Sequence, residues 1–414
     1  MLKRKRIVIT GVGVFAGNGK GKEEFYQSLK DGKVGYAPVT LFDAGDFSVN
    51  IGAEVKDFDA KNYFGPKGLR LLDRSTRLLV AASKLAIADS KFVITNRNTD
   101  KVGVSVGTTL GSLKSIAEFD EVTLKEGPRY VNPALFPNTV INSPASQVNI
   151  WNNIKGFSTT LSTGFTSAID ALSYAYDYFQ LYDTKVIYAG SVEEMCFHTY
   201  YGFYTLKFLS GSKEGTTFIN CPFDKRRNGI TFGEGACLLA MEEHKHAVKR
   251  QAPIQAEVLG FGYYFDPFRI NKYNPRGTGV KAAIRNALED AQVDINEIDY
   301  ICANANSTQA ADKIETEAIK EVFGKRAYDI PVSAIKSMTG ECYSLSGAFA
   351  AAACVGAINE DFLPPTVNYQ EKDPDCDLDY VPNKSRPAKL NKVLIITFGP
   401  NGSNSCMVLG RYKP

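Results

Sequence analysis

Two turns rich in glycine, serine and threonine each lead into a segment of small residues, and either turn could present a reactive side chain. The first lies within residues 162–180 and carries Phe165, and the second lies within 340–357 and carries Glu341 and Cys342. A thiol with an ionisable neighbour can attack an acyl group, whereas a phenyl ring has no lone pair to donate. Taken alone, Phe165 is more simply a core residue of a helix, Glu341 a solvated turn residue and Cys342 a small buried hydrophobe.

The segments around these turns predict strands that alternate with helices. Apolar residues recur at three- and four-residue spacing after the first turn, which indicates a helix with one apolar stripe: Ile169, Leu172, Tyr176 and Phe179. Short runs of β-branched residues and glycine indicate buried strands. We therefore expect a protein of the α/β class with mostly buried sheets.

The two halves of the chain also echo one another. Each opens with an apolar strand, continues with a strand that ends in small or polar residues, and closes on a β-branched strand after its turn and helix: residues 6–13, 102–107 and 185–190, then 254–262, 300–304 and 392–397. This duplication predicts a layered α/β/α/β/α body, with an N-terminal half over 1–253 and a C-terminal half over 254–414.

Composition excludes several classes of function. The 414 residues are 44% hydrophobic and 22% charged, with a formal net charge of only +3, so the sequence gives no support for a nucleic-acid partner. No apolar stretch approaches membrane-spanning length. The eight cysteines are scattered without a CxxC pair, which argues against a metal site or a disulfide framework and favours the reducing cytoplasm. We expect no bound cofactor and no metal.

Five segments spread along nearly the whole chain share their pattern with one enzyme family. They are residues 6–13, 72–77, 221–236, 333–340 and 398–404. The third is similar to the specific stretch RPFDxxRxGxxxGEGA, the fourth to a KSxxG lysine motif and the fifth to a closing FGFGGxN loop. Together they resemble the β-ketoacyl-acyl-carrier-protein synthases. The resemblance implies a thiolase-like duplicated fold that dimerises through its central strands.

In that family a cysteine accepts the acyl chain, and two histidines assist decarboxylation and stabilise the oxyanion. Aligned on the motifs of this chain, the cysteine position holds Phe165, the first histidine position Asn306 and the second Glu341, while Lys336 is retained. An amide has no basic nitrogen, and a carboxylate would repel a malonyl group. The resemblance therefore implies that no catalytic residue remains, and that Lys336 has a structural role.

Non-condensing members of the family, the chain length factors or KSβ subunits of type II polyketide synthases, also lack the nucleophile. The Tyr343-Ser344 pair resembles their version of the loop. This likeness implies a heterodimer with a cysteine-bearing ketosynthase (KSα), action on a phosphopantetheinylated acyl carrier protein, and control of polyketide or polyene chain length. It also implies a set of substrate-tunnel residues, which would otherwise be ordinary core: Leu113, Ile116, Phe119, Phe136 and Phe398.

Three alternatives remain at this point. The chain could be a divergent acyltransferase or malonyl decarboxylase that acts alone through Cys342 or Glu341. It could be a scaffold without influence on the tunnel. The basic cluster Lys225-Arg226-Arg227 could meet an acidic carrier protein, or it could form ion pairs within a solvated loop.

Overall fold

The computed structural model describes residues 4–414, and its largest element is one mixed β-sheet of eleven strands. Five strands from the first half of the chain are neighbours in the order β6 (Ser158–Leu161), β5 (Val102–Gly107), β7 (Val186–Glu193), β8 (Gly235–Glu243) and β1 (Ile7–Ala16). Five from the second half continue in the order β9 (Ala256–Phe265), β15 (Ser403–Gly410), β14 (Lys392–Phe398), β10 (Tyr300–Cys302) and β11 (Val332–Ser333). The eleventh strand, β2 (Gly19–Lys20), pairs with β1.

The two sets of five strands have the same topology. Outward from the junction of β1 with β9, each set has two antiparallel pairs followed by two parallel pairs. At the junction itself, Ile7, Val8 and Ile9 lie opposite Val258, Glu257 and Ala256. The duplication predicted from the sequence is thus visible in the order and direction of the strands. The division between residues 253 and 254 stays a prediction, because the sheet continues across it.

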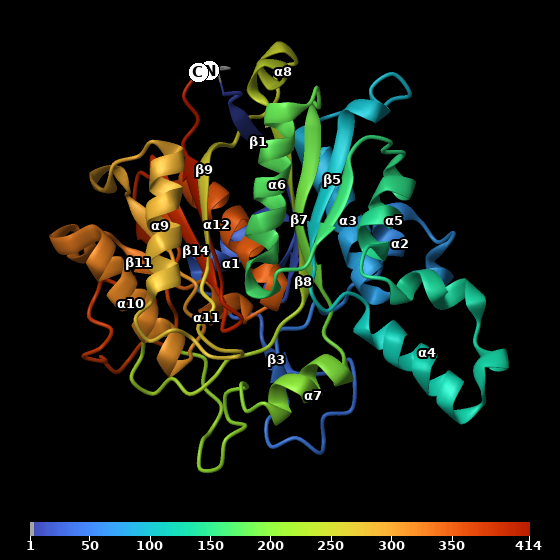
Figure 1. Cartoon of the computed structure of the whole chain (residues 1–414), viewed down its shortest axis with the longest axis horizontal. Coiled ribbons are helices and arrows are strands. Elements are labelled where there is room, and N and C mark those ends of the chain that lie inside the picture. Colours follow the sequence, from blue (N-terminus) through green and yellow to red (C-terminus); the bar gives the residue numbers. More distant parts are fainter. Residues whose placement is uncertain (1–3) are drawn as a thin grey trace.

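Helices cover both halves of the sheet and also lie between them (Figure 1). In the middle are α6 (Ser167–Leu181) and α12 (Ser346–Glu360). Outside the first set of strands are α3 (Arg74–Ser90) and α5 (Ser143–Asn152), and outside the second set are α9 (Thr278–Ala291) and α10 (Gln309–Phe323). The expected α/β/α/β/α layering is confirmed.

Apart from the helix that follows β5, the remaining helices and strands are short and lie mainly in the connections. They are α1 (Lys22–Asp31), α2 (Lys61–Phe64), α7 (Phe197–Thr205), α8 (His244–Lys249), α11 (Lys336–Thr339), β3 (Ala37–Pro38), β4 (Ile51–Gly52), β12 (Phe362–Leu363) and β13 (Arg386–Pro387).

Helix α12 can occupy the centre of the molecule because its side chains are small. Every residue from Ser346 to Ile358 is buried, which is the pattern of a helix surrounded on all sides. Gly356 faces the ring of Tyr26 so closely that an added Cβ would lie 2.6 Å from a ring carbon. A short 3₁₀ turn precedes each central helix, at Gly164–Thr166 before α6 and at Tyr343–Leu345 before α12. These two turns contact each other, so the candidate site forms at their junction.

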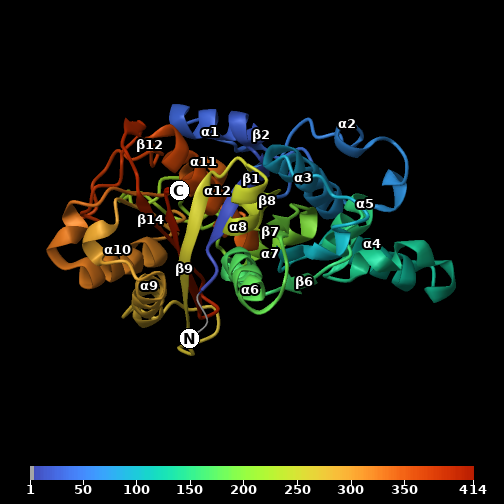
Figure 2. The same cartoon turned by 90° about the horizontal axis from the view of Figure 1, so that it is seen from above.

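An arm extends from the body of the protein after β5. It contains α4 (Leu113–Lys125) and two 3₁₀ turns, Pro128–Tyr130 and Pro133–Thr139, and it projects away from the layers in both views (Figures 1 and 2). No residue of α4 is buried. Large apolar side chains are exposed along the arm and just after it: Leu124, Tyr130, Leu135, Phe136, Val140 and Ile141. Within residues 4–414, no helix is long and apolar enough to cross a membrane.

Candidate active-site region

Phe165 lies in the turn that the sequence analysis singled out, at the start of α6. The preceding Gly164 has φ = 77°, and a Cβ on it would lie 2.5 Å from the side chain of Asn401, so only glycine fits there. Phe165 is 6% exposed, and its ring packs edge-on against Tyr343 with centroids 4.4 Å apart. Gly399 borders the other side of the ring, since a Cβ there would lie 2.4 Å from it. The ring therefore fills the space at the tip of this turn.

The structure brings Asn306, Lys336 and Glu341 into direct contact. Lys336 Nζ lies 2.8 Å from Glu341 Oε2, and Asn306 Nδ2 donates to the same oxygen at 3.1 Å. Glu341 Oε1 accepts from Ser346 Oγ at 2.6 Å and from the backbone N–H of Tyr343 at 3.1 Å. Glu341 is 1% exposed and Lys336 5%, so the two form a buried ion pair. Glu341 is therefore not a solvated turn residue.

Lys336 links three segments of the second half of the chain. Besides Glu341, its Nζ donates to Asn304 Oδ1 at 2.9 Å. Asn304 in turn donates to the carbonyl of Phe398 at 3.1 Å. One ammonium group thus connects the loop after β10, the loop after α11 and the end of β14. This is the kind of structural contact that the sequence analysis expected of this lysine.

Cys342 is poorly placed to be a nucleophile. Its side chain is fully buried, and its Sγ lies 3.6 Å from the carbonyl oxygen of Thr339 and 3.9 Å from that of Glu234. Burial, followed by the nearby carboxylates of Glu341 and Glu234, raises the pKa of this thiol well above its usual value. Since the thiolate is the reactive form, this environment favours the inert thiol.

Two buried carboxylates that the sequence analysis missed hold the loop after β10. Glu315 accepts the backbone N–H groups of Asn304 and Ala305, both at 2.7 Å. Asp312 accepts that of Asn306 at 3.0 Å. Burial raises the pKa of Glu315 to about 8 and that of Asp312 to about 6. Their spacing of three residues on α10, directly after the loop, is the sequence signal that could have revealed them.

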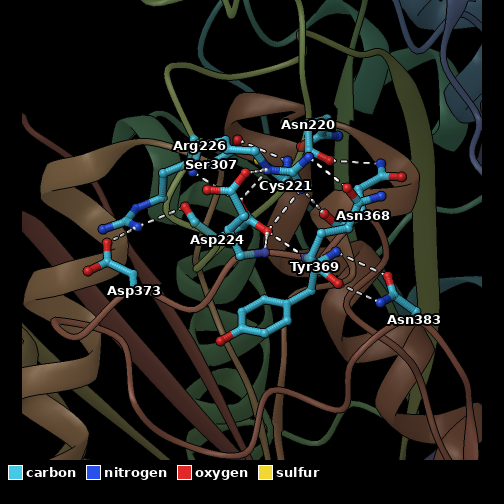
Figure 3. A network of polar contacts seen from close by, with 12 residues as sticks. Asn220, Cys221, Asp224, Arg226, Ser307, Asn368, Tyr369, Asp373 and Asn383 are labelled. Atoms are coloured by element: carbon cyan, nitrogen blue, oxygen red, sulfur yellow. Dashed lines mark hydrogen bonds and ion pairs between the residues drawn. The ribbon is translucent and has the colours of Figure 1, made fainter.

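Asp224 organises the loop that carries the predicted basic cluster (Figure 3). It pairs with Arg226 at 2.8 Å and accepts the backbone N–H groups of Gln370 and Glu371. Arg227 is 2% exposed and pairs with Asp373. Both arginines are thus engaged in ion pairs within the protein, as one of the two alternatives expected, and Lys225 is the exposed member of the cluster.

The predicted tunnel residues fall into two groups. Leu113, Ile116 and Phe119 are half-buried on α4, and the ring of Phe119 meets that of Phe136 at 6.1 Å. Phe136 is 57% exposed. A cleft of about 920 Å³ runs beside the arm and includes Phe119 in its wall. Phe398 lies elsewhere, buried at the end of β14 beside Tyr273 and the Asn304 loop.

The three histidines lie on other elements than the two turns that form the candidate site. His198 is on α7 and contributes to the wall of the cleft, while His244 and His246 are on α8. His246 Nδ1 lies 2.6 Å from Glu242, far along the sheet from the two turns. Among residues 4–414, no group of three or more histidine, cysteine or acidic side chains could hold a metal ion.

Comparison with known proteins identifies the family. The models of the β-ketoacyl synthase N-terminal domain and of its C-terminal domain match residues 4–247 and 255–370. The chain belongs to the β-ketoacyl synthase family, and its fold is the thiolase-like fold of that family.

Similar proteins include synthases of fatty acids and of polyketides. The chain is 35% identical over 411 residues to 3-oxoacyl-[acyl-carrier-protein] synthase 2 of Coxiella burnetii. The matched residues cover 99% of each of the two proteins. It is 34% identical over 418 residues to the tetracenomycin polyketide synthase ketoacyl synthase alpha subunit of Streptomyces glaucescens, covering 99% of this chain and 98% of that protein.

Two solved structures are similar over the whole length. The ishigamide ketosynthase/chain length factor superposes with a TM-score of 0.93 at 32% identity, covering 99% of this chain and 100% of that chain. A type II polyketide synthase acyl-carrier protein in complex with its ketosynthase bound to the hexaketide contains a chain that superposes with a TM-score of 0.89 at 26% identity, with the same coverage.

The buried ion pair leads to a prediction for stability. Lys336→Met leaves the Glu341 carboxylate buried and unpaired, so we expect it to lower the free energy of unfolding by about 3–5 kcal/mol. The double variant Lys336→Met/Glu341→Leu should recover most of this loss in the free energy of unfolding, because neither position then carries a buried charge. Urea unfolding of both variants measures the difference. Lys320→Met, at the partly exposed pair with Asp377, is the control and should cost less than about 1 kcal/mol. A similarly small cost for Lys336→Met would contradict the description of the pair.

A second prediction concerns pH. The folded protein holds the proton of Glu315 up to a pKa of about 8, whereas the unfolded chain releases it near the ordinary value of 4.5. Between these pH values the folded state binds more protons, so this group makes the protein less stable as pH rises. The wild type should therefore lose stability relative to Glu315→Gln from pH 5 to pH 8, by up to about 1.4 kcal/mol per pH unit. Urea unfolding at several pH values tests this. Glu317→Gln, at an exposed position on the same helix, is the control. The difference in stability between the wild type and this variant should not change over the same pH range.

Proposed function

We propose that this chain is a catalytically silent ketosynthase subunit, a chain length factor or KSβ. It would form a heterodimer with a cysteine-bearing ketosynthase and help to set the length of a polyketide or polyene chain built on phosphopantetheinylated acyl carrier protein. The observation that carries the proposal is the buried Glu341, which occupies the second histidine position and is paired with the retained Lys336. A negative charge fixed at this place opposes both a malonyl carboxylate and a developing oxyanion.

The two other altered positions agree with this proposal. The ring of Phe165 occupies the nucleophile turn, and it can neither attack a thioester nor leave room for a loaded chain. Asn306 offers an amide where an imidazole would act, and its Nδ2 is already engaged with Glu341. Action alone through Cys342 is not supported, because the thiol is buried and its pKa is raised.

The heterodimer and the acyl carrier protein in this proposal are drawn from the similar solved structures. One similar structure is named a ketosynthase/chain length factor, and another holds an acyl-carrier protein in complex with its ketosynthase. The relatives in Coxiella and Streptomyces are named as a synthase and as an alpha subunit. Overall similarity therefore does not separate a silent subunit from an active one, and the proposal depends on positions 165, 306 and 341.

The proposal is tested by mass spectrometry on the two proteins together. This chain is co-expressed with a candidate cysteine-bearing ketosynthase and incubated with acyl-loaded carrier protein. We expect a one-to-one heterodimer under native conditions, with the acyl mass only on the partner after denaturation. An acyl mass on this chain would show that it has a nucleophile of its own, and the silent-subunit proposal would fall.

A second test restores the lost thiol. Phe165→Cys alone should give no ketoacyl product, because Asn306 and Glu341 still cannot assist decarboxylation or stabilise the oxyanion. The measurement is product formation from labelled malonyl carrier protein, with the variant supplied without any partner ketosynthase. The same assay on an active ketosynthase is the positive control. Measurable ketoacyl product from the single variant would show that the two other replacements do not silence the site.

A third test addresses chain length. Phe119→Ala and Phe136→Ala remove facing rings on the arm, so they should give longer or mixed products from the heterodimer if the arm closes the partner's tunnel. Product analysis by liquid chromatography and mass spectrometry measures the change. Tyr328→Ala, which removes another exposed ring outside the arm, is the matched control and should leave product length unchanged. An unchanged product distribution in all three variants would favour a scaffold without influence on the tunnel.

A further inference from the structure

The carboxylate of Glu341 is enclosed by donors that come from several elements. Lys336 Nζ on α11 and Asn306 Nδ2 after β10 approach one oxygen at 2.8 and 3.1 Å. Ser346 Oγ at the start of α12 and the backbone N–H of Tyr343 approach the other at 2.6 and 3.1 Å. One cation and three neutral donors thus converge on one buried carboxylate.

These donors are oriented by contacts that do not involve Glu341. Asn306 Oδ1 accepts from Thr308 Oγ1 at 2.8 Å, which directs the Nδ2 of the same amide toward Glu341. Ser346 Oγ accepts the backbone N–H of Cys342 at 2.9 Å, which leaves its own hydrogen free for the carboxylate. Lys336 Nζ is also held by Asn304 Oδ1 at 2.9 Å. Each of these three side chains thus has an orienting contact besides Glu341, so a carboxylate bound in place of this side chain would meet donors that already point toward it.

Other buried carboxylates of the protein have different surroundings. Glu315 accepts two backbone N–H groups, and burial raises its pKa to about 8. Glu234 pairs with Arg74, whose side chain is 24% exposed and thus reaches solvent. Asp312 and its cation Arg227 are also both almost fully buried, but their closest atoms lie 3.6 Å apart, whereas those of Glu341 and Lys336 lie 2.8 Å apart. The ammonium group of Lys336 is held by the charge of Glu341 and by the amide oxygen of Asn304.

We propose that these donors form an anion-binding site which the chain fills with its own Glu341, and that shortening this side chain opens the site to a small carboxylate. Replacing glutamate by alanine removes a fragment with the composition of acetate, so acetate is the matched ligand. While Glu341 is in place, the site cannot admit a carboxylate borne by a substrate. The inference deepens the proposed silence of the chain. Its test requires neither partner nor product, so either proposal can fail while the other stands.

The test is thermal unfolding of the full-length chain with increasing sodium acetate. Glu341→Ala should show a saturable rise in Tm of several degrees, because a ligand that binds only the folded state stabilises it. Sodium pivalate at the same concentrations is the control, since it has the same charge but is too bulky for the space. Wild type and Glu341→Gln should not respond to acetate beyond the effect of pivalate. Equal responses to the two salts, or no response in Glu341→Ala, would overturn the proposal.

Two further measurements guard against a variant that does not fold. If Glu341→Ala is insoluble, it is refolded from urea in acetate or in pivalate, and we expect soluble protein only in acetate. Equal recovery, or none in either salt, counts against the site. The double variant Lys336→Met/Glu341→Ala removes the cation together with the carboxylate, so it should lose the specific effect of acetate. A full acetate effect in this double variant would show that Lys336 does not form part of the site.

Discussion

The loops of the candidate site depend on one buried ion pair, Lys336 with Glu341. A charge buried without a partner costs several kcal/mol, so each of these residues requires the other. Lys336 also holds Asn304, and Glu341 also holds Asn306 and the start of α12. The pair therefore fixes the loop after β10 relative to the segment that joins α11 to α12. Glu315 and Asp312 support the same loop through its backbone N–H groups.

Under the proposed function, this arrangement would explain how a ketosynthase site can lose its chemistry and keep its shape. At the turn before α6, the ring of Phe165 packs edge-on against that of Tyr343. Between the loop after β10 and the loop after α11, the amide of Asn306 is hydrogen-bonded to the carboxylate of Glu341. Each replacement satisfies its neighbours by packing or hydrogen bonding, so the central helices α6 and α12 keep their places. The site is stable because its polar groups have partners within the chain.

The arm gives the protein a surface of a different kind. Helix α4 has no buried residue, and the turns that follow it expose several large apolar side chains, Phe136 and Tyr130 among them. An exposed apolar segment of this kind is typical of an interaction surface. The proposed heterodimer would need a surface of this kind. The cleft beside the arm is lined by both apolar and charged residues, including Phe119 and Glu194.

The sequence by itself determined the family and the fold class, because motif order and hydrophobic periodicity are local properties of the chain. It also predicted that Asn306, Lys336 and Glu341 belong to one region. Only the tertiary structure decided what these residues do there, since a hydrogen bond between Asn306 and Glu341 joins positions 35 residues apart. It also separated Phe398 from the residues of the arm and revealed Glu315 and Asp312 beneath the loop. Burial decided the state of Cys342 and the role of Glu341, because the energy of a thiol or a carboxylate depends on the dielectric and the donors around it.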